Sequence, residues 1–296
     1  TPLSLNARDQ AIDAWPSARV LADPEQLLDF GEALASLNRF EAPDVPHANL
    51  GPRKGATWVH IPIETDPESQ TAWNFRLQYA LLHDVQLRVY DASGQLVHQS
   101  NLGAAIPFAY REQPTRALST LMQLPRAQRF NVLIRVHTPT ATLLPMAFLQ
   151  STALGVEESH EQMLQGLMGG LWLFMVAYSV INALVHRQSL FLVYACSVLS
   201  SWCFAHAVFG TGPQYLWTHS SWWTLKMSTL APLAMVAANA QFFVGSLDMR
   251  STAPRAAQGM AVISVVAILA ALGFALDWMP YQASSIVGMV LVFAHL

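Results

Sequence analysis

The chain has 296 residues, of which 53% are hydrophobic, and a formal net charge of −3. Residues 162–296 contain only 4 of the 16 Lys and Arg residues and 2 of the 19 Asp and Glu residues, far below the roughly 25% of charged residues in soluble domains. With no basic patch in either part, the composition excludes a wholly soluble protein, a disordered chain and a nucleic-acid binder.

Residues 1–152 are predicted to form an external all-β domain. After a short helix expected at 24–34, apolar and polar residues alternate, which is typical of strands with one buried face. Strands are expected at 57–64, 72–79, 85–90, 96–99, 117–124, 131–137 and 143–150, with a glycine-containing hairpin turn at 91–94. Short strands with frequent turns predict a β-sandwich or jelly roll.

Residues 153–163 form a juxtamembrane linker that we expect to be helical. Its Glu157, His160 and Glu161 share a helix face, and this pattern fits either a metal site or, as we expect, a solvated acidic turn. We therefore predict no metal and no other cofactor. Since the sequence has neither a Gly-x-Ser-x-Gly motif nor a zinc-type histidine cluster, we also expect no catalytic residue and no enzymatic activity in these residues.

Residues 164–296 are predicted to form a bundle of transmembrane helices. A membrane-spanning helix needs about 20 mostly apolar residues. Spans are expected at 164–185, 190–209, 227–245 and 257–276, and a fifth begins at 281–296. Thr1 and the apolar stretch at the other end indicate a trimmed chain, so the bundle is expected to be cut after about five spans.

The loop charges predict the orientation of the bundle. Arg187 follows the first span, and Arg250 and Arg255 follow the third, whereas the second and fourth loops are poor in Lys and Arg. Because Lys and Arg concentrate in cytoplasmic loops, residues 1–161 are expected outside the cytoplasm. Four tryptophans fit the opposite, outer boundary: Trp217, Trp222, Trp223 and Trp278.

Few polar groups lie within the spans. Asn182, Asn239 and Gln241 are expected to form hydrogen bonds across the bundle. Cys196 and Cys203 lie about 10 Å apart along one predicted helix, too far for a disulfide. Since no Asp, Glu or Arg lies well inside a span, a transporter or channel with an external accessory domain is the less favoured alternative.

The chain resembles the bacterial seven-transmembrane receptors with diverse intracellular signalling modules. Residues 1–152 resemble their second type of extracellular domain, and residues 164–296 resemble part of their membrane region. The stretches that carry the resemblance are 49–51 with 57–61, 84–90, Gly103, 107–108, Arg111, 133–136, 166–182 and 190–199. Ala104 and His137 depart from the family pattern, which leaves ligand identity open.

The resemblance implies a multi-pass signal-transduction receptor of the bacterial inner membrane with a periplasmic N-terminal domain. That domain is expected to sense a carbohydrate-like ligand and to signal through the bundle. The output, absent from this chain, would be a cytoplasmic histidine kinase or diguanylate cyclase. The expected partners are membrane lipid, a carbohydrate or other small external ligand, and a second copy or partner receptor. A receptor that senses a partner protein rather than a small ligand is the alternative.

Aromatic and arginine side chains of the external domain are the candidate ligand contacts, because sugars stack on aromatic faces and accept hydrogen bonds from Arg. The candidates are Trp58, Trp73, Arg76, Arg88, Tyr90, Arg111 and Arg135. Core packing is the competing interpretation for Trp58, and a structural ion pair competes for Arg111 and Arg135. Arg88 and Tyr90 share a strand face and are the favoured surface candidates.

Overall fold

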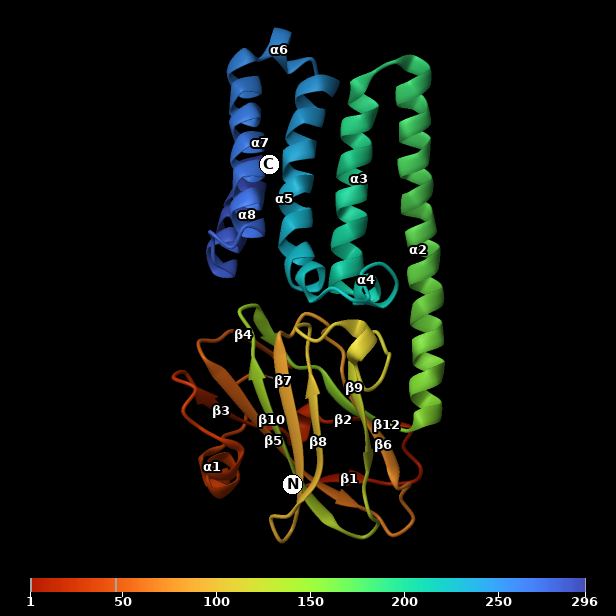
Figure 1. Ribbon diagram of the computed structural model, residues 1–296, viewed down its shortest axis with the longest axis vertical. Coiled ribbons are helices and arrows are strands. Elements are labelled where there is room, and N and C mark those ends of the chain that lie inside the picture. The colour runs from red at the N-terminus through yellow and green to blue at the C-terminus, as the bar shows by residue number, and fades with distance from the viewer. Residues whose placement is uncertain (1, 46, 296) are drawn as a thin grey trace. The chain divides into compact units, whose positions relative to one another are not determined.

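The computed structural model describes residues 2–45 and 47–295. It divides the chain into two compact units (Figure 1). The first comprises Thr1–Glu161 with Pro213–Ser221, and the second comprises Gln162–Gly212 with Trp222–Leu296. The first unit holds all the strands and the second is helical, as the sequence predicted.

A six-stranded sheet forms one layer of the first unit. Its strands are β1 (Leu3–Leu5), β3 (Arg19–Asp23), β5 (Ala56–Thr65), β7 (Asp84–Asp91), β8 (Leu96–Leu102) and β10 (Arg129–His137). They follow the order β1-β5-β10-β7-β8, with β3 also paired to β5. All pairs are antiparallel except β1 with β5.

A four-stranded sheet forms the second layer. It has the order β2-β12-β6-β9, with β2 (Ala11–Asp13), β12 (Met146–Leu149), β6 (Ala72–Leu77) and β9 (Leu118–Gln123). A two-stranded sheet pairs β4 (Asn49–Pro52) with β11 (Ala141–Leu143). Three 3-10 turns complete the unit: η1 (Trp15–Ser17), η2 (Leu37–Arg39) and η3 (Phe108–Tyr110).

The core lies between the two sheets, which identifies the unit as a β-sandwich. Alternate residues of β7, such as Leu87, and of β10, such as Ile134, are fully buried on the inner face of the larger sheet. The smaller sheet contributes Phe75 and Phe148, whose rings meet edge to face with centroids 5.4 Å apart. The period of two in the sequence is the signature of this one-sided burial.

A short helix covers the outer face of the larger sheet. The sequence predicted a helix over 24–34, but α1 runs over Phe30–Ala35. Asp29 accepts a hydrogen bond from the Glu32 backbone and Glu32 bonds back to the Asp29 backbone, a capping box that starts the helix at Phe30. Strands β1 to β4 were also missed, because most are short and all pair with partners distant in sequence.

The helices of the rest of the chain follow the predicted spans closely. They are α2 (Ser151–His186), α3 (Ser189–Val208), α4 (Thr211–Tyr215), α5 (Ser221–Ser246), α6 (Met249–Thr252), α7 (Pro254–Ala275) and α8 (Tyr281–His295). By length and composition, α2, α3, α5 and α7 can each cross a membrane, and α8 is a shorter apolar helix. Helix α2 is continuous from the first unit into the second.

Side-chain hydrogen bonds join helices of the second unit. Ser197 of α3 donates to Asn239 of α5 at 2.5 Å, and Gln241 of α5 donates to Ser264 of α7 at 3.0 Å. The prediction for Asn182 was wrong, because its amide bonds to the Tyr178 carbonyl of its own helix. Both cysteines are free thiols on α3, as the spacing predicted.

Candidate ligand-binding groove on the smaller sheet

Four of the predicted ligand contacts gather on the outer face of the larger sheet, beneath α1 and its flanking segment. The Trp58 side chain is fully buried and meets Phe30 of α1 edge to face at 4.8 Å. Tyr90 is only 8% exposed and belongs to the same cluster, so it is not the surface group that the sequence favoured. The guanidinium of Arg88 lies 4.1 Å from the centre of the Phe30 ring.

Polar contacts hold the covering segment in place. Asp23 accepts hydrogen bonds from the Leu27 and Leu28 backbones and from the Trp58 indole. Burial raises the pKa of the Asp23 carboxyl, but these three donors and the charge of Arg135 outweigh burial, so the pKa lies below its ordinary value. Arg135 itself pairs with Asp84 at 3.4 Å and donates to Gln26 at 2.9 Å.

Trp73 lies inside the sandwich core rather than at a surface. Its side chain is fully buried, and its indole donates to the Ser69 hydroxyl at 3.2 Å and to the Gln70 carbonyl at 3.0 Å. These bonds satisfy the polar atom of a ring that packs among apolar side chains. The structure therefore places Trp73 in the core, away from the groove described next.

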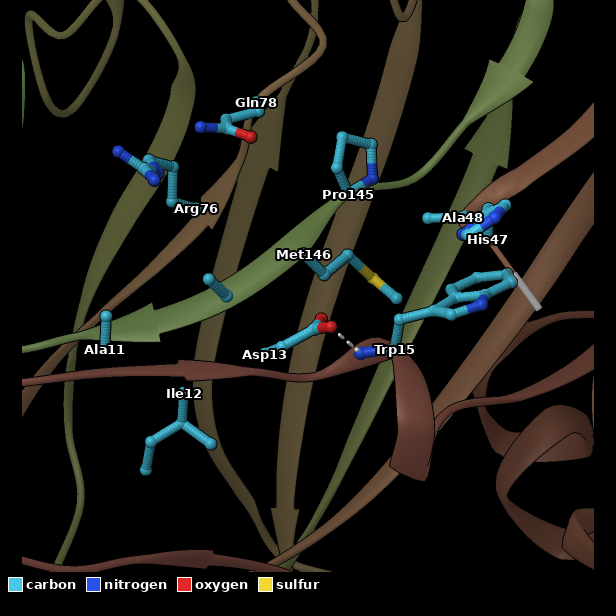
Figure 2. Close-up of a pocket in the computed structure, with 11 residues that line it drawn as sticks. Ala11, Ile12, Asp13, Trp15, His47, Ala48, Arg76, Gln78, Pro145 and Met146 are labelled. Carbon is cyan, nitrogen blue, oxygen red and sulfur yellow. Dashed lines mark hydrogen bonds between the residues drawn. The ribbon is translucent and has the colours of Figure 1, made fainter. Parts of the chain in front are cut away.

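A groove of about 400 Å³ lies on the outer face of the smaller sheet (Figure 2). Asp13, Ala147 and Arg76 are register partners on β2, β12 and β6, so they share this face. The lining residues are Ala11, Ile12, Asp13, Trp15, His47, Ala48, Arg76, Gln78, Pro145, Met146 and Ala147. Of the predicted contacts, Arg76 alone lines this groove.

The groove combines polar groups with an apolar wall. Arg76 is 5% exposed, and its Nε is buried with no hydrogen-bond acceptor among the described residues. Asp13 accepts from the Trp15 backbone at 3.0 Å, the bond drawn in Figure 2. Together with Gln78 and Met146, these side chains offer donors, a carboxylate and apolar surface to one bound molecule.

The sequence did not identify Asp13, His47 or Gln78 as candidates. Asp13 ends a three-residue strand and His47 lies outside strands, so alternation could not assign either of them to a face. Gln78 lies in the predicted strand 72–79, on the same face as Arg76, and was missed because the candidates were chosen among aromatic and arginine side chains. Asp13 lies beside Arg76 only because β12, from residues 146–149, pairs with both β2 and β6. No short-range signal in the sequence carries that pairing.

The first turns of α2 are fastened to the same face of the smaller sheet. Arg76 forms an ion pair with Glu157, and Asn74 donates to the Ser151 hydroxyl at 3.0 Å. Arg116 forms an ion pair with Glu161. The acidic residues predicted to be solvated are thus paired, and no group of His, Cys, Asp and Glu among the described residues could hold a metal ion.

Arg111, the last of the seven candidates, follows η3 in the loop between β8 and β9. Its three guanidinium nitrogens are buried and have no hydrogen-bond acceptor among the described residues. The ring of Phe108 lies 5.4 Å from its guanidinium carbon. Burial lowers the pKa of Arg111 to about 10, so the group is still charged at neutral pH.

Two protein families match the chain. Residues 16–150 are similar to the family described as 7TMR-DISM extracellular 2, and residues 161–296 are similar to the family described as 7TM diverse intracellular signalling. Together these matches leave out only residues 1–15 and 151–160. No curated protein matches the chain.

Solved structures show a weak likeness. A putative β-galactosidase from Bacteroides fragilis shares 9% identity with a TM-score of 0.31, over 47% of this chain and 23% of its own. A family 6 carbohydrate-binding module shares 12% identity with a TM-score of 0.27, over 51% of this chain and 100% of its own. A β-glucosidase from Kluyveromyces marxianus shares 12% identity with a TM-score of 0.22, over 45% and 14%. The chain thus spans less than a quarter of the length of either enzyme.

Proposed function

Because this chain belongs to the 7TMR-DISM family of membrane sensory receptors, we propose that its β-sandwich binds a carbohydrate-like ligand in the groove of Asp13 and Arg76. One observation carries the proposal: Arg76 both lines the groove and forms an ion pair with Glu157 on α2. A ligand that engages Arg76 therefore acts on the helix that continues into the membrane unit.

The chemistry of the groove suits a sugar. A sugar hydroxyl both donates and accepts, so it pairs with the Asp13 carboxylate and with the N–H groups of Arg76 and Gln78. The apolar sides of a pyranose ring match the apolar part of the wall, to which Trp15 and Met146 contribute the edges of side chains buried in the core. A volume of about 400 Å³ falls within the range of ligand-binding pockets.

Ligand binding changes the attachment of α2 through competition for Arg76. The guanidinium has five donors, and the buried Nε is without an acceptor in the described residues. The relevant equilibrium is between Arg76 paired with Glu157 and Arg76 released from it. A ligand oxygen that binds one of these two states more tightly stabilises that state, and only this difference in affinity shifts the equilibrium. Ligand binding in the groove and the attachment of the first turns of α2 are then coupled.

The proposed setting is the bacterial inner membrane, with the sandwich in the periplasm. The Lys and Arg residues of the first and third loops between spans support this orientation. The signal passes through the bundle to a cytoplasmic histidine kinase or diguanylate cyclase, the outputs that the family resemblance implies. In this proposal residues 1–296 bind and transmit but do not catalyse.

Titration calorimetry on the whole chain tests ligand binding. The protein is held in micelles of a polyoxyethylene ether detergent, which contains no sugar, and is titrated with glucose, galactose and cellobiose. We expect one of these to bind, and Asp13→Asn to weaken its binding by roughly tenfold, equivalent to about 1.4 kcal/mol. Asp44→Asn, at an exposed position outside the groove, is the matched control.

Hydrogen exchange tests coupling to α2. We expect the bound sugar to change amide protection in residues 151–161, and Glu157→Gln to reduce that change while binding persists. Failure of all three sugars to bind would remove the carbohydrate part of the proposal. A bound sugar without any change in α2 would remove the signalling route through Arg76.

A further inference from the structure

Arg111 is a buried cation whose hydrogen-bonding groups are not used. Arg76, Arg116 and Arg135 each pair with a carboxylate. Arg111 has no such partner among the described residues, and all three of its nitrogens are buried. Since charged donors buried without acceptors are costly, a group of this kind points to a partner that lies outside the chain.

The carboxylate closest to Arg111 in sequence is already engaged. Glu112 accepts hydrogen bonds from the Ser100 hydroxyl at 2.8 Å and from the Thr120 hydroxyl at 3.0 Å. These bonds direct the Glu112 carboxylate to strands β8 and β9. Glu112 therefore accepts hydrogen bonds from hydroxyls of both strands, and no ion pair joins it to Arg111 in the described part of the chain.

A second segment of the same unit, residues 213–221, lies beside η3. The backbone N–H of Ala109 donates to the Thr218 carbonyl at 3.0 Å, and the rings of Tyr110 and His219 lie 6.4 Å apart. Both segments belong to the first unit. On this second segment the indole N–H of Trp217 is also buried with no acceptor among the described residues.

Gln214 lies on the same segment, and its amide oxygen is buried without a donor in the described part of the chain. The oxygen and nitrogen of an amide are exchanged by a 180° turn, so Gln214 can present its NH₂ group at this position instead. The two segments then offer unpaired donors from Arg111, Trp217 and Gln214, while the carboxylate of Glu112 is occupied by the Ser100 and Thr120 hydroxyls.

We propose that Arg111, with the segment 213–221, forms a binding site for an oxyanion, a carboxylate or phosphate group of an external molecule. The planar fork of a guanidinium matches both groups with two parallel hydrogen bonds. Two sources share this chemistry: a soluble anion and the phosphate of a lipid headgroup. Arg111 does not line the groove of Arg76, so this site is independent of the proposed sugar site.

The test uses the whole chain in polyoxyethylene ether micelles, which contain neither phosphate nor sugar. In one arm inorganic phosphate or glucuronate is added at constant ionic strength, with glucose as the uncharged counterpart of glucuronate. In the other arm phosphatidylglycerol is mixed into the micelles with no soluble anion. Calorimetric titration measures affinity in the first arm, and the shift of the thermal unfolding midpoint measures binding in both.

We expect an oxyanion from at least one source to bind, and Arg111→Gln to weaken this binding at least roughly tenfold, a change of about 1.4 kcal/mol. Arg111→Lys retains a charge but lacks the fork, so it should bind with intermediate affinity. Arg126→Gln removes the same charge at an exposed position and should leave affinity unchanged. If Arg111→Gln fails to fold, Arg111→Lys measured against Arg126→Gln decides the question.

The proposal is overturned if no oxyanion binds in either arm, or if the Arg111 variants bind it as tightly as Arg126→Gln. It is also overturned if Arg111→Gln raises the unfolding midpoint and oxyanions leave all variants unaffected, since Arg111 is then only an unfavourable buried charge. None of these results bears on glucose binding that depends on Asp13, so failure here is distinct from failure of the proposed function.

Discussion

On the outer face of the larger sheet, α1 packs its Phe30 ring against the buried Trp58, whereas on the outer face of the smaller sheet α2 is held by charges such as Arg76 with Glu157. Apolar contact is non-directional, and a small polar ligand does not compete for it. An ion pair is directional, and a ligand oxygen can replace one of its partners. In the proposed function, the sandwich therefore has one face that is fixed and one that responds to a ligand.

The largest expected loss of unfolding free energy comes from removing an apolar contact between α1 and the larger sheet. Trp58→Ala removes a fully buried ring that packs on α1, and we expect a loss of about 3–5 kcal/mol in unfolding free energy. Urea unfolding of the whole chain in micelles, followed by circular dichroism in the β-sheet region, measures the loss. Leu27→Ala, which truncates a side chain that is 75% exposed, should change little. An equally small effect for Trp58→Ala would contradict the fixed role of this face.

A smaller loss of unfolding free energy is expected on the charged face, and its size depends on which partner of the ion pair is replaced. Glu157→Gln leaves the buried Arg76 unpaired and should cost about 1–3 kcal/mol. Arg76→Gln leaves Glu157, whose side chain is 40% exposed and can be hydrated, so we expect a cost of under about 1 kcal/mol. The same unfolding measurement compares the two variants. Glu64→Gln, from the more exposed pair with Arg129, is the control, and equal costs for the first two variants would refute the asymmetry.

Loss of the α1 cap should have an effect of about 1 kcal/mol. Asp29→Ala removes the acceptor for the Glu32 backbone N–H and half of the capping box. Hydrogen exchange in residues 30–35 should rise, while exchange in residues 151–161 stays unchanged. Asp44→Ala, an exposed aspartate outside the cap, provides the comparison. A rise in exchange at both helices would mean that the two faces are not independent.

The smallest expected effect is a pH dependence of the larger sheet's outer face. Burial lowers the pKa of His60 below 6.5, and its ring bonds to the Asn131 side chain at 2.9 Å. The unfolded chain then takes up a proton before the folded chain does, so stability is full above about pH 6.5 and falls as the pH drops toward the lowered value. His60→Gln should reduce this slope in unfolding measurements between pH 7 and 5. Burial also lowers the pKa values of His83 and His98, so both contribute to the slope. A slope unaffected by His60→Gln would show that His60 is not its source.

Periodicity was sufficient to predict the sandwich and the spans. The alternation in β7 and β10 marks one buried face over eight and nine residues, and uninterrupted apolar runs mark the helices. The start of α1 was misplaced although the sequence carries the signal, since Asp29 followed three residues later by Glu32 is a capping-box pattern. Strands of three or four residues, such as β2, are too short for any period to be read.

The candidate site was only partly predictable, because side-chain burial depends on which element covers a face. Tyr90 and Arg88 alternate outward from the core, but outward from the sheet is still beneath α1. Arg76 was identified by residue type, yet its pairing with Glu157 and its place beside Asp13 depend on contacts between distant segments. Sequence alone cannot supply those contacts.

The chain's two thiols are both on α3, and residues 1–161 contain no cysteine. Folding of the sandwich therefore requires no oxidising compartment and no disulfide isomerase, so its production is indifferent to the redox state of the host cell. Any cysteine introduced there is the only thiol on that domain. Single fluorescent or spin labels placed beside the groove and on the first turns of α2 can thus be attached once Cys196 and Cys203 are replaced by serine.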